Sequence, residues 1–141
     1  MTKAILPTLL CCLCLSYAPH LFAQNEKLSQ ALNAQVSVSG EMTTDKFQQL
    51  IKNGFKSVIV NRPDQEQGNR ISVSQLRQIP EQSHVSVIYQ PIVNGQVTQT
   101  EVIEFSKYYK ELPKPILMVC RSDSRSSILF NQAKSQGLLH E

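Results

Sequence analysis

The chain has 141 residues, with 14 Lys and Arg, 11 Asp and Glu, and a formal net charge of +3 at pH 7. The basic residues form no tract, which argues against a nucleic-acid partner. The length suits one domain with a single hydrophobic core, and the sequence shows no internal repeat and no low-complexity linker.

Residues 1–23 have the layout of a secretory signal peptide. Lys3 precedes an apolar stretch from Ala4 to Tyr17, and Ala23 is a small residue suited to signal-peptidase cleavage. The apolar stretch is short for a membrane span. We therefore expect an exported, soluble protein that is periplasmic in a two-membraned bacterium, with no membrane span in the mature chain.

Three of the four cysteines, Cys11, Cys12 and Cys14, lie in this expected signal peptide. They raise a lipoprotein as the alternative, but the residues before them are mostly Leu or Cys rather than small. After cleavage Cys120 would be the only thiol, so it cannot form an internal disulfide or belong to a cysteine zinc cluster. A free cysteine is most often a small buried hydrophobe, yet a lone thiol in an oxidising compartment also marks a candidate reactive site.

The first half of the remaining chain predicts a strand and a helix after a polar start. Residues 24–35 are weakly patterned, and we expect a lead-in segment there. Residues 36–39 alternate between apolar and polar side chains, which predicts a short strand. Thr43 or Thr44 can then cap a helix that ends at Gly54, in the left-handed conformation that glycine favours.

A second strand is expected over residues 55–60, because an apolar run of this length is typical of a buried strand. A polar loop, a short helix over residues 72–79 and a further strand over residues 85–89 follow. The helix stops at Pro80, which cannot continue it.

The last part of the chain predicts a helix over residues 98–108, a buried strand over residues 116–119 and a final helix. Ser126 or Ser127 is expected to cap that final helix, which ends at Gly137. Strands and helices alternate throughout. We therefore expect a single α/β domain over residues 36–137, with a largely parallel central sheet flanked by helices.

Cys120 directly follows the predicted strand 116–119, and residues 121–125 lead from it into the last helix. Ligands of open α/β sheets bind beyond the carboxyl ends of the strands. Loop amides and a helix N-terminus attract an anion there, and they stabilise a thiolate together with Arg121 or Arg125. This pattern predicts an anion-binding loop that can also hold a persulfide.

Three motifs stand in an order typical of one known family. They are NRPD (residues 61–64), VIYQPIV (residues 87–93) and LPKPILMVCRSDSRSS (residues 112–127). With the strand–helix–strand pattern before NRPD, the chain from about residue 36 to residue 137 resembles the phosphatase-like domain of beta-lactamase hydrolase-like proteins. That family is a small bacterial relative of the cysteine phosphatases, and the resemblance implies their fold.

The resemblance also implies the roles of the loop residues. It implies that Cys120 is the nucleophile, that Arg125 clamps the transferred group, and that the loop amides hold its oxygens. Ser126 is then placed to donate a hydrogen bond to the thiolate. The implied anion-binding loop comprises Arg121, Ser122, Asp123, Ser124 and Ser126.

Three features of the sequence keep other chemistries open. Four residues separate Cys120 from Arg125, which is the spacing of the rhodanese sulfurtransferase loop, whereas cysteine phosphatases have five. Asp123 replaces the family's loop glycine; it tolerates a left-handed backbone, but its carboxylate opposes an anion. A phosphatase benefits from a general acid, and Asn94 stands where one is expected, so Asp64 is the other candidate, with a solvated turn residue as its alternative reading.

The sequence leaves three functions open. The first is a phosphatase-like hydrolase in which Cys120 attacks a phosphomonoester and water resolves the phosphocysteine. The second is a sulfurtransferase that carries a Cys120 persulfide, and the third is a non-catalytic anion- or partner-binding module. We expect the first because of the whole-chain resemblance, with a small anionic substrate (a phosphoester or a sulfane-sulfur donor), no cofactor and no metal.

Overall fold

The computed structural model describes residues 27–79, 84–93 and 96–140. The expected signal peptide over residues 1–23, the start of the lead-in segment, and the residues Pro80 and Asn94 lie outside these ranges. Within the described part of the chain, no helix is both long and apolar enough to cross a membrane.

Among the residues that the structure describes, five strands form one sheet in the order β1-β2-β5-β3-β4. They are β1 (Gln30–Ala31), β2 (Val36–Ser39), β3 (Ser57–Val60), β4 (Ser86–Tyr89) and β5 (Ile116–Val119). The last four run parallel to their neighbours, and only the β1–β2 pair is antiparallel. The predicted α/β domain with a largely parallel sheet is therefore confirmed, and β1 is an addition within the segment predicted as a lead-in.

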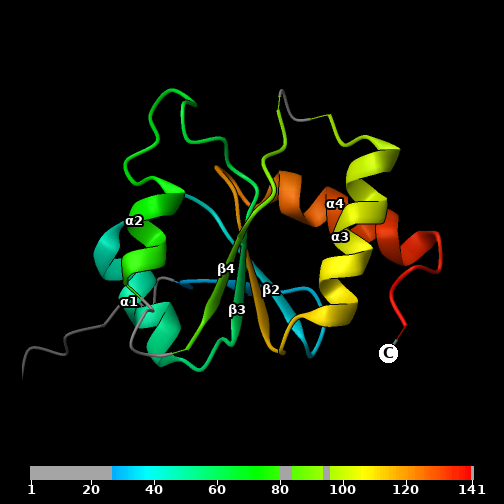
Figure 1. The fold of residues 1–141 in the computed structure, drawn as a ribbon, viewed down its shortest axis with the longest axis horizontal. Helices are drawn as coiled ribbons and strands as arrows, with labels where there is room; N and C mark the ends of the chain where they lie inside the picture. Colours follow the sequence, from blue (N-terminus) through cyan, green and yellow to red (C-terminus); the bar gives the residue numbers. More distant parts are fainter. Residues whose placement is uncertain (1–26, 80–83, 94–95, 141) are drawn as a thin grey trace, which may run out of the picture.

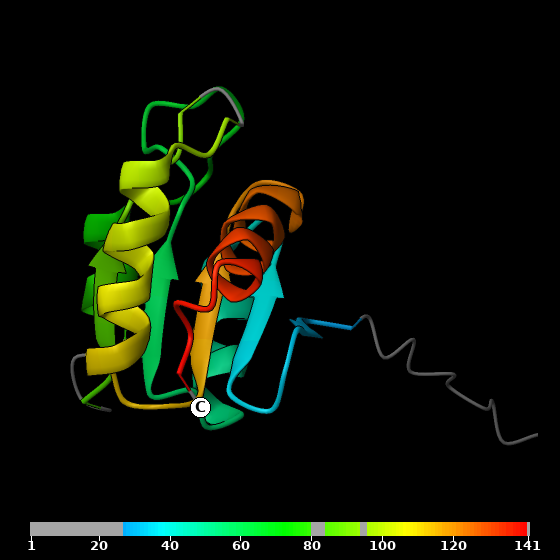
Figure 2. The same ribbon diagram turned by 90° about the vertical axis from the view of Figure 1, so that its right-hand side faces the viewer.

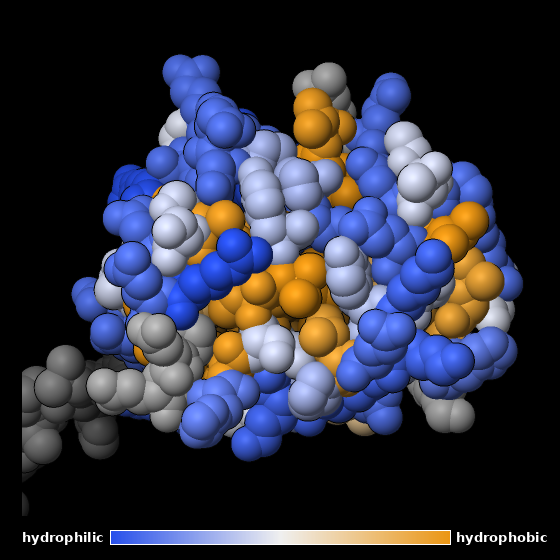
Figure 3. All heavy atoms as spheres, in the orientation of Figure 1, coloured by the Kyte–Doolittle hydropathy of each residue, from blue (hydrophilic) through white to orange (hydrophobic). Residues whose placement is uncertain are grey.

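In the described ranges, four helices cover the sheet. They are α1 (Thr44–Lys52), α2 (Val73–Gln78), α3 (Gln99–Glu111) and α4 (Ser124–Ser135). Figures 1 and 2 show α1 and α2 on one face of the sheet and α3 and α4 on the other. The molecule thus has three layers, and β4 forms an edge of the sheet. Seen from that edge, Figure 3 shows apolar side chains gathered in the middle of the face, with polar side chains around them.

The helix starts follow from side-chain caps. Thr43 Oγ1 accepts the Lys46 N–H at 3.3 Å, as predicted for α1, and Ser72 and Thr98 form capping boxes for α2 and α3. The cap predicted for α4 is wrong. This helix begins at Ser124, after Asp123 rather than at a serine hydroxyl.

Strand β5 lies between two hydrophobic clusters. Ile116 and Met118 belong to the cluster under α3 and α4, whereas Leu117 and Val119 belong to the cluster under α1 and α2. All four side chains are at most 2% exposed. A strand with both faces covered must be apolar at every position, and this explains the unbroken run that ends at the candidate cysteine.

Candidate active site

Three polar or reactive residues directly follow the parallel strands at one edge of the sheet. Asn61 follows β3, Gln90 follows β4, and Cys120 follows β5; each is at most 2% exposed. Their backbone amides continue the parallel ladder: Cys120 N–H donates to Ser39 O at 3.1 Å and Asn61 N–H donates to Val119 O at 2.7 Å. The ladder therefore fixes these three residues at the carboxyl edge, where α/β proteins bind ligands.

Asp123 turns the chain from the loop into α4. Its φ is +69°, in the left-handed region, and its side chain makes no cap hydrogen bond. The Ser127 N–H and Oγ both donate to Asp123 O, at 3.0 and 2.9 Å, which completes the turn. The expectation that aspartate can take the left-handed conformation of the family's glycine is confirmed.

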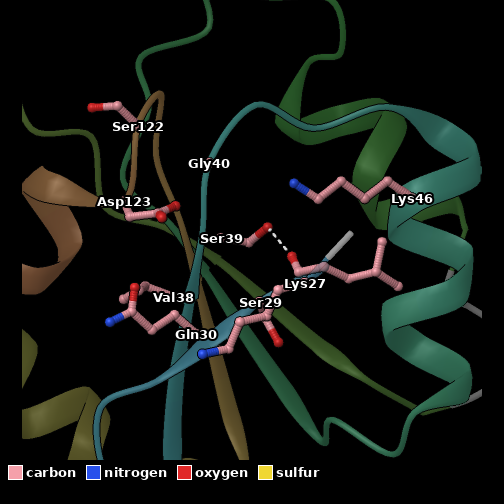
Figure 4. A pocket seen from close by; sticks show the side chains of 10 residues that line it. Lys27, Ser29, Gln30, Val38, Ser39, Gly40, Lys46, Ser122 and Asp123 are labelled. Carbon is pink, nitrogen blue, oxygen red and sulfur yellow. Dashed lines mark hydrogen bonds between the residues drawn. The ribbon is translucent and has the colours of Figure 1, made fainter. Parts of the chain in front are cut away.

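The Asp123 carboxylate lies against Gly40, just beyond β2 (Figure 4). A Cβ added at Gly40 would stand 3.1 Å from Asp123 Oδ1 and 3.3 Å from Arg121 O, so only glycine leaves the loop undisturbed. Asp123 and Ser122 line a cavity of about 410 Å³ on this side of the loop. The other lining residues are Lys27, Leu28, Ser29, Gln30, Val38, Ser39, Gly40 and Lys46.

Cys120 lines a different cavity, which shares no residue with the first. The volume of this second cavity is about 10 Å³, roughly the space of one water molecule. Its walls are Met42, Val60, Arg62, Asn69, Ile71, Leu76, Val119 and Cys120. The Asp123 carboxylate and the Cys120 thiol therefore line separate spaces, and the thiol, 1% exposed, is closed off from solvent.

Two arginines meet at one carboxylate beyond β3 and β4. Arg125 Nη1 donates to Ile92 O at 3.1 Å, and its Nη2 lies 2.6 Å from Glu66 Oε2. Arg62 Nε lies 3.2 Å from the other oxygen, Glu66 Oε1. That second contact lacks hydrogen-bond alignment, so it is chiefly coulombic. The Arg62 and Arg125 side chains are only 5% and 13% exposed, which strengthens their interaction with the carboxylate.

A chain of neutral hydrogen bonds fixes the start of α4. Ser126 Oγ donates to Asn61 Oδ1 at 2.8 Å, and Asn61 Nδ2 donates to Gln90 O at 3.0 Å. Gln90 Nε2 donates in turn to Glu101 O at 2.9 Å, in the first turn of α3. The Ser126 hydroxyl, predicted to serve the thiolate, thus donates to Asn61 in this structure.

Asp64 lies in the β3–α2 loop. Its Oδ1 accepts the Val73 N–H at 2.8 Å at the start of α2, and its own N–H donates to Tyr89 Oη at 2.9 Å. Such contacts are typical of a turn residue that also holds the start of a helix, whereas the alternative expected for Asp64 is a solvated turn residue. Within the described ranges, no group of three His, Cys, Asp or Glu side chains could hold a metal ion.

Four of the residues that build this site are not among the predicted site residues, although Asn61 and Arg62 stand in the NRPD motif. Asn61 and Gln90 directly follow apolar strands, as Cys120 does, and this placement is the signal that could have found them. Arg62 and Glu66 lie in a polar loop, where their four-residue separation is the only hint of a pair. The rest of the fold largely buries Arg62 and Glu66 and brings their side chains together.

The buried network predicts a stability effect. Ser126→Ala leaves Asn61 Oδ1 buried without its donor, and we expect the free energy of unfolding to fall by about 1–3 kcal/mol. Urea denaturation followed by circular dichroism measures this change. Ser135→Ala, at an exposed position on the same helix, should stay within about 0.5 kcal/mol of the parent. Equal losses in the two variants would contradict the role of the network.

Comparison with known sequences identifies one family. The sequence model of one protein family, the phosphatase-like domain of beta-lactamase hydrolase-like protein, matches residues 29–137. Beta-lactamase hydrolase-like proteins of Xylella fastidiosa and Agrobacterium fabrum are each 22% identical over 99 residues, which cover 70% of this chain. Those residues are only 23% of each relative, so the chain spans a minor part of their length.

Comparison with solved structures finds proteins of the same fold. A candidate phosphatase of Neisseria meningitidis is 25% identical, with a TM-score of 0.71 and 78% of each chain covered. The catalytic core of the PP-IP phosphatase SIW14 of S. cerevisiae shares the fold at 10% identity, with a TM-score of 0.54 and 77% of this chain and 74% of that chain covered. The chain belongs to the family of the phosphatase-like domain of beta-lactamase hydrolase-like proteins.

Proposed function

We propose that the protein is a phosphatase-like hydrolase in which Cys120 is the nucleophile and Arg125 binds the transferred anionic group. One observation carries the proposal: Cys120 directly follows the central strand β5 of a phosphatase-like fold and directly precedes the loop into α4. Arg125, in the first turn of α4, is mostly buried and paired with a carboxylate. An anion that binds to Arg125 would therefore lie in a site with little water.

The reaction would run in two steps. The Cys120 Sγ attacks phosphorus, an S–P bond forms, the ester P–O bond breaks, and the leaving alkoxide takes a proton. Water then attacks the phosphocysteine, which releases orthophosphate and restores the thiolate. The sequence offers Asp64 as the acid for the first step, but its Oδ1 already accepts the Val73 N–H. Solvent is therefore the proton source that we favour.

A sulfurtransferase is the second candidate function, and the size of the Cys120 cavity favours it. A space of about 10 Å³ needs less enlargement for one added sulfur atom than for a phosphoryl group. In that reaction, with thiosulfate as the donor, its terminal sulfur forms a bond to Cys120 Sγ while the S–S bond of thiosulfate breaks and sulfite leaves. A thiophilic acceptor such as cyanide then removes the outer sulfur.

A paired assay separates the two candidates. The full chain and its Cys120→Ser variant are tested for hydrolysis of p-nitrophenyl phosphate and for transfer of sulfur from thiosulfate to cyanide. We expect phosphate release by the parent and its loss in the variant, because a serine hydroxyl is a far weaker nucleophile at neutral pH. Sulfur transfer without hydrolysis would support the sulfurtransferase function. Inactivity in both assays would favour a binding module.

The Asp123 side chain predicts a gain of activity on substitution. Asp123→Gly removes a negative charge near the loop and fits a φ of +69° without strain. We expect kcat/KM for p-nitrophenyl phosphate to rise about fivefold, the effect of ~1 kcal/mol. Asp123→Asn is the matched control, since it removes the charge and keeps the size. A rise in the Gly variant alone would assign the effect to the backbone and not to the charge.

We further propose that the protein acts after export, with residues 1–23 removed as a signal peptide. The apolar stretch from Ala4 to Tyr17 and the small residue Ala23 support this proposal. Intact-mass measurement of the protein recovered from a producing bacterium should give a chain that begins within a few residues of Gln24. A chain that retains Met1, or a mass with an attached lipid, would contradict it.

A further inference from the structure

Glu66 is the one acidic side chain that pairs with both Arg62 and Arg125 among the described residues. Its carboxylate gives one oxygen to each arginine, at 3.2 Å to Arg62 and 2.6 Å to Arg125. Arg62 follows β3 and Arg125 lies on α4, so the carboxylate joins two separate segments of the chain. One planar anion therefore occupies the space between two nearly buried cations.

We propose that Arg62 and Arg125 form a two-point site for one anionic group, and that Glu66 occupies this site in the free protein. The substrate's anionic group displaces Glu66, and the β3–α2 loop then opens over Cys120. The inference rests on the proposed function in one respect, because it takes the anionic group of the substrate as the natural ligand. It adds Arg62 as a substrate-binding residue and Glu66 as an internal competitor.

The chemistry of the two arginines fits a tetrahedral oxyanion. Guanidinium groups bind carboxylates and phosphates through the same fork of N–H donors, so a carboxylate bound by two arginines marks a place where a phosphate can bind. Arg125 is also held from outside this pair by Ile92 O. That anchor does not involve the β3–α2 loop, and it keeps Arg125 at the sheet edge when Glu66 leaves.

The charge balance favours a ligand with two negative charges. Arg62 and Arg125 supply two positive charges, and Glu66 returns one. Glu41 contributes little, since its Oε1 is 4.0 Å from Arg62 Nη1 and its side chain is 59% exposed and screened by solvent. Exchange of Glu66 for a dianionic phosphomonoester would therefore neutralise the pair more fully.

The same loop closes the space around Cys120. Arg62 and Asn69, at either end of the loop, both line the 10 Å³ cavity beside the thiol. Arg62 Nη2 donates to Gln67 O at 3.2 Å, and a Cβ added at Gly68 would lie 3.6 Å from that nitrogen. The loop wraps around Arg62, so release of Glu66 loosens the wall that covers Cys120.

Glu66→Gln tests the proposal in the full chain, because it keeps the size of the side chain and removes its charge. Calorimetry in a Cys120→Ser background should show orthophosphate binding with a Kd about tenfold lower than with Glu66 present. In chains that retain Cys120, iodoacetamide should alkylate the tryptic peptide containing Cys120 faster, again by about tenfold. Arg62→Lys should weaken orthophosphate binding, because lysine lacks the fork of donors.

Glu111→Gln is the matched control, since it removes one negative charge from an exposed position on α3. It should change neither the Kd nor the alkylation rate. Glu66→Asp is the second variant: it keeps the charge but is too short to reach both arginines, so it should behave like Glu66→Gln. Thermal unfolding followed by circular dichroism establishes which variants are folded.

The opposite result overturns the proposal. If Glu66→Gln and Glu66→Asp weaken orthophosphate binding or leave it unchanged, then Glu66 positions Arg125 and does not compete with the ligand. Binding and alkylation need no turnover, so absent hydrolysis of p-nitrophenyl phosphate would count against the phosphatase proposal alone. Hydrolysis by the parent with unchanged Kd and alkylation rate in both Glu66 variants would count against the competitor alone.

Discussion

The parallel pairing of β5 with β2 on one side and β3 on the other positions everything else in the site. Because β5 is a central strand, Cys120, which follows it, lies between the carboxyl ends of β2 and β3. The amide of Cys120 donates to Ser39 O, and Val119 O accepts the amide of Asn61. The strand pairing thus fixes the backbone position of Cys120, whereas the cavity beside its thiol is lined in part by the segments that follow β2 and β3.

Much of the fold can be predicted because its strands and helices carry strong local signals. β3 and β5 are buried on both faces, so they read as apolar runs, and the capping residues Thr43 and Thr98 are visible in the sequence. β1 cannot be predicted in this way, since its two exposed residues are ordered only by pairing with β2. The start of α4 is missed because Asp123 turns the backbone without using its side chain.

The site shows the same contrast between residues with a local sequence signal and residues that only the folded structure brings together. Cys120 is placed by the strand that it follows, and Arg125 by the start of the helix to which it belongs, and both are local information. The pairing of Arg62 with Glu66 does not, because a polar loop has the same sequence whether it is solvated or folded over a cavity. Only the packed structure shows that Arg62 is 4% exposed and lines the space beside the thiol.

The hydrogen-bond chain from Ser126 through Asn61 and Gln90 to Glu101 O consists of a hydroxyl, two side-chain amides and two backbone carbonyls. None of these groups gains or loses a proton between mildly acid and mildly alkaline pH. The support that aligns α4 with the strand ends therefore keeps the same donors and acceptors over this pH range. A change of pH would consequently act on this protein through groups outside the network, with the scaffold held constant.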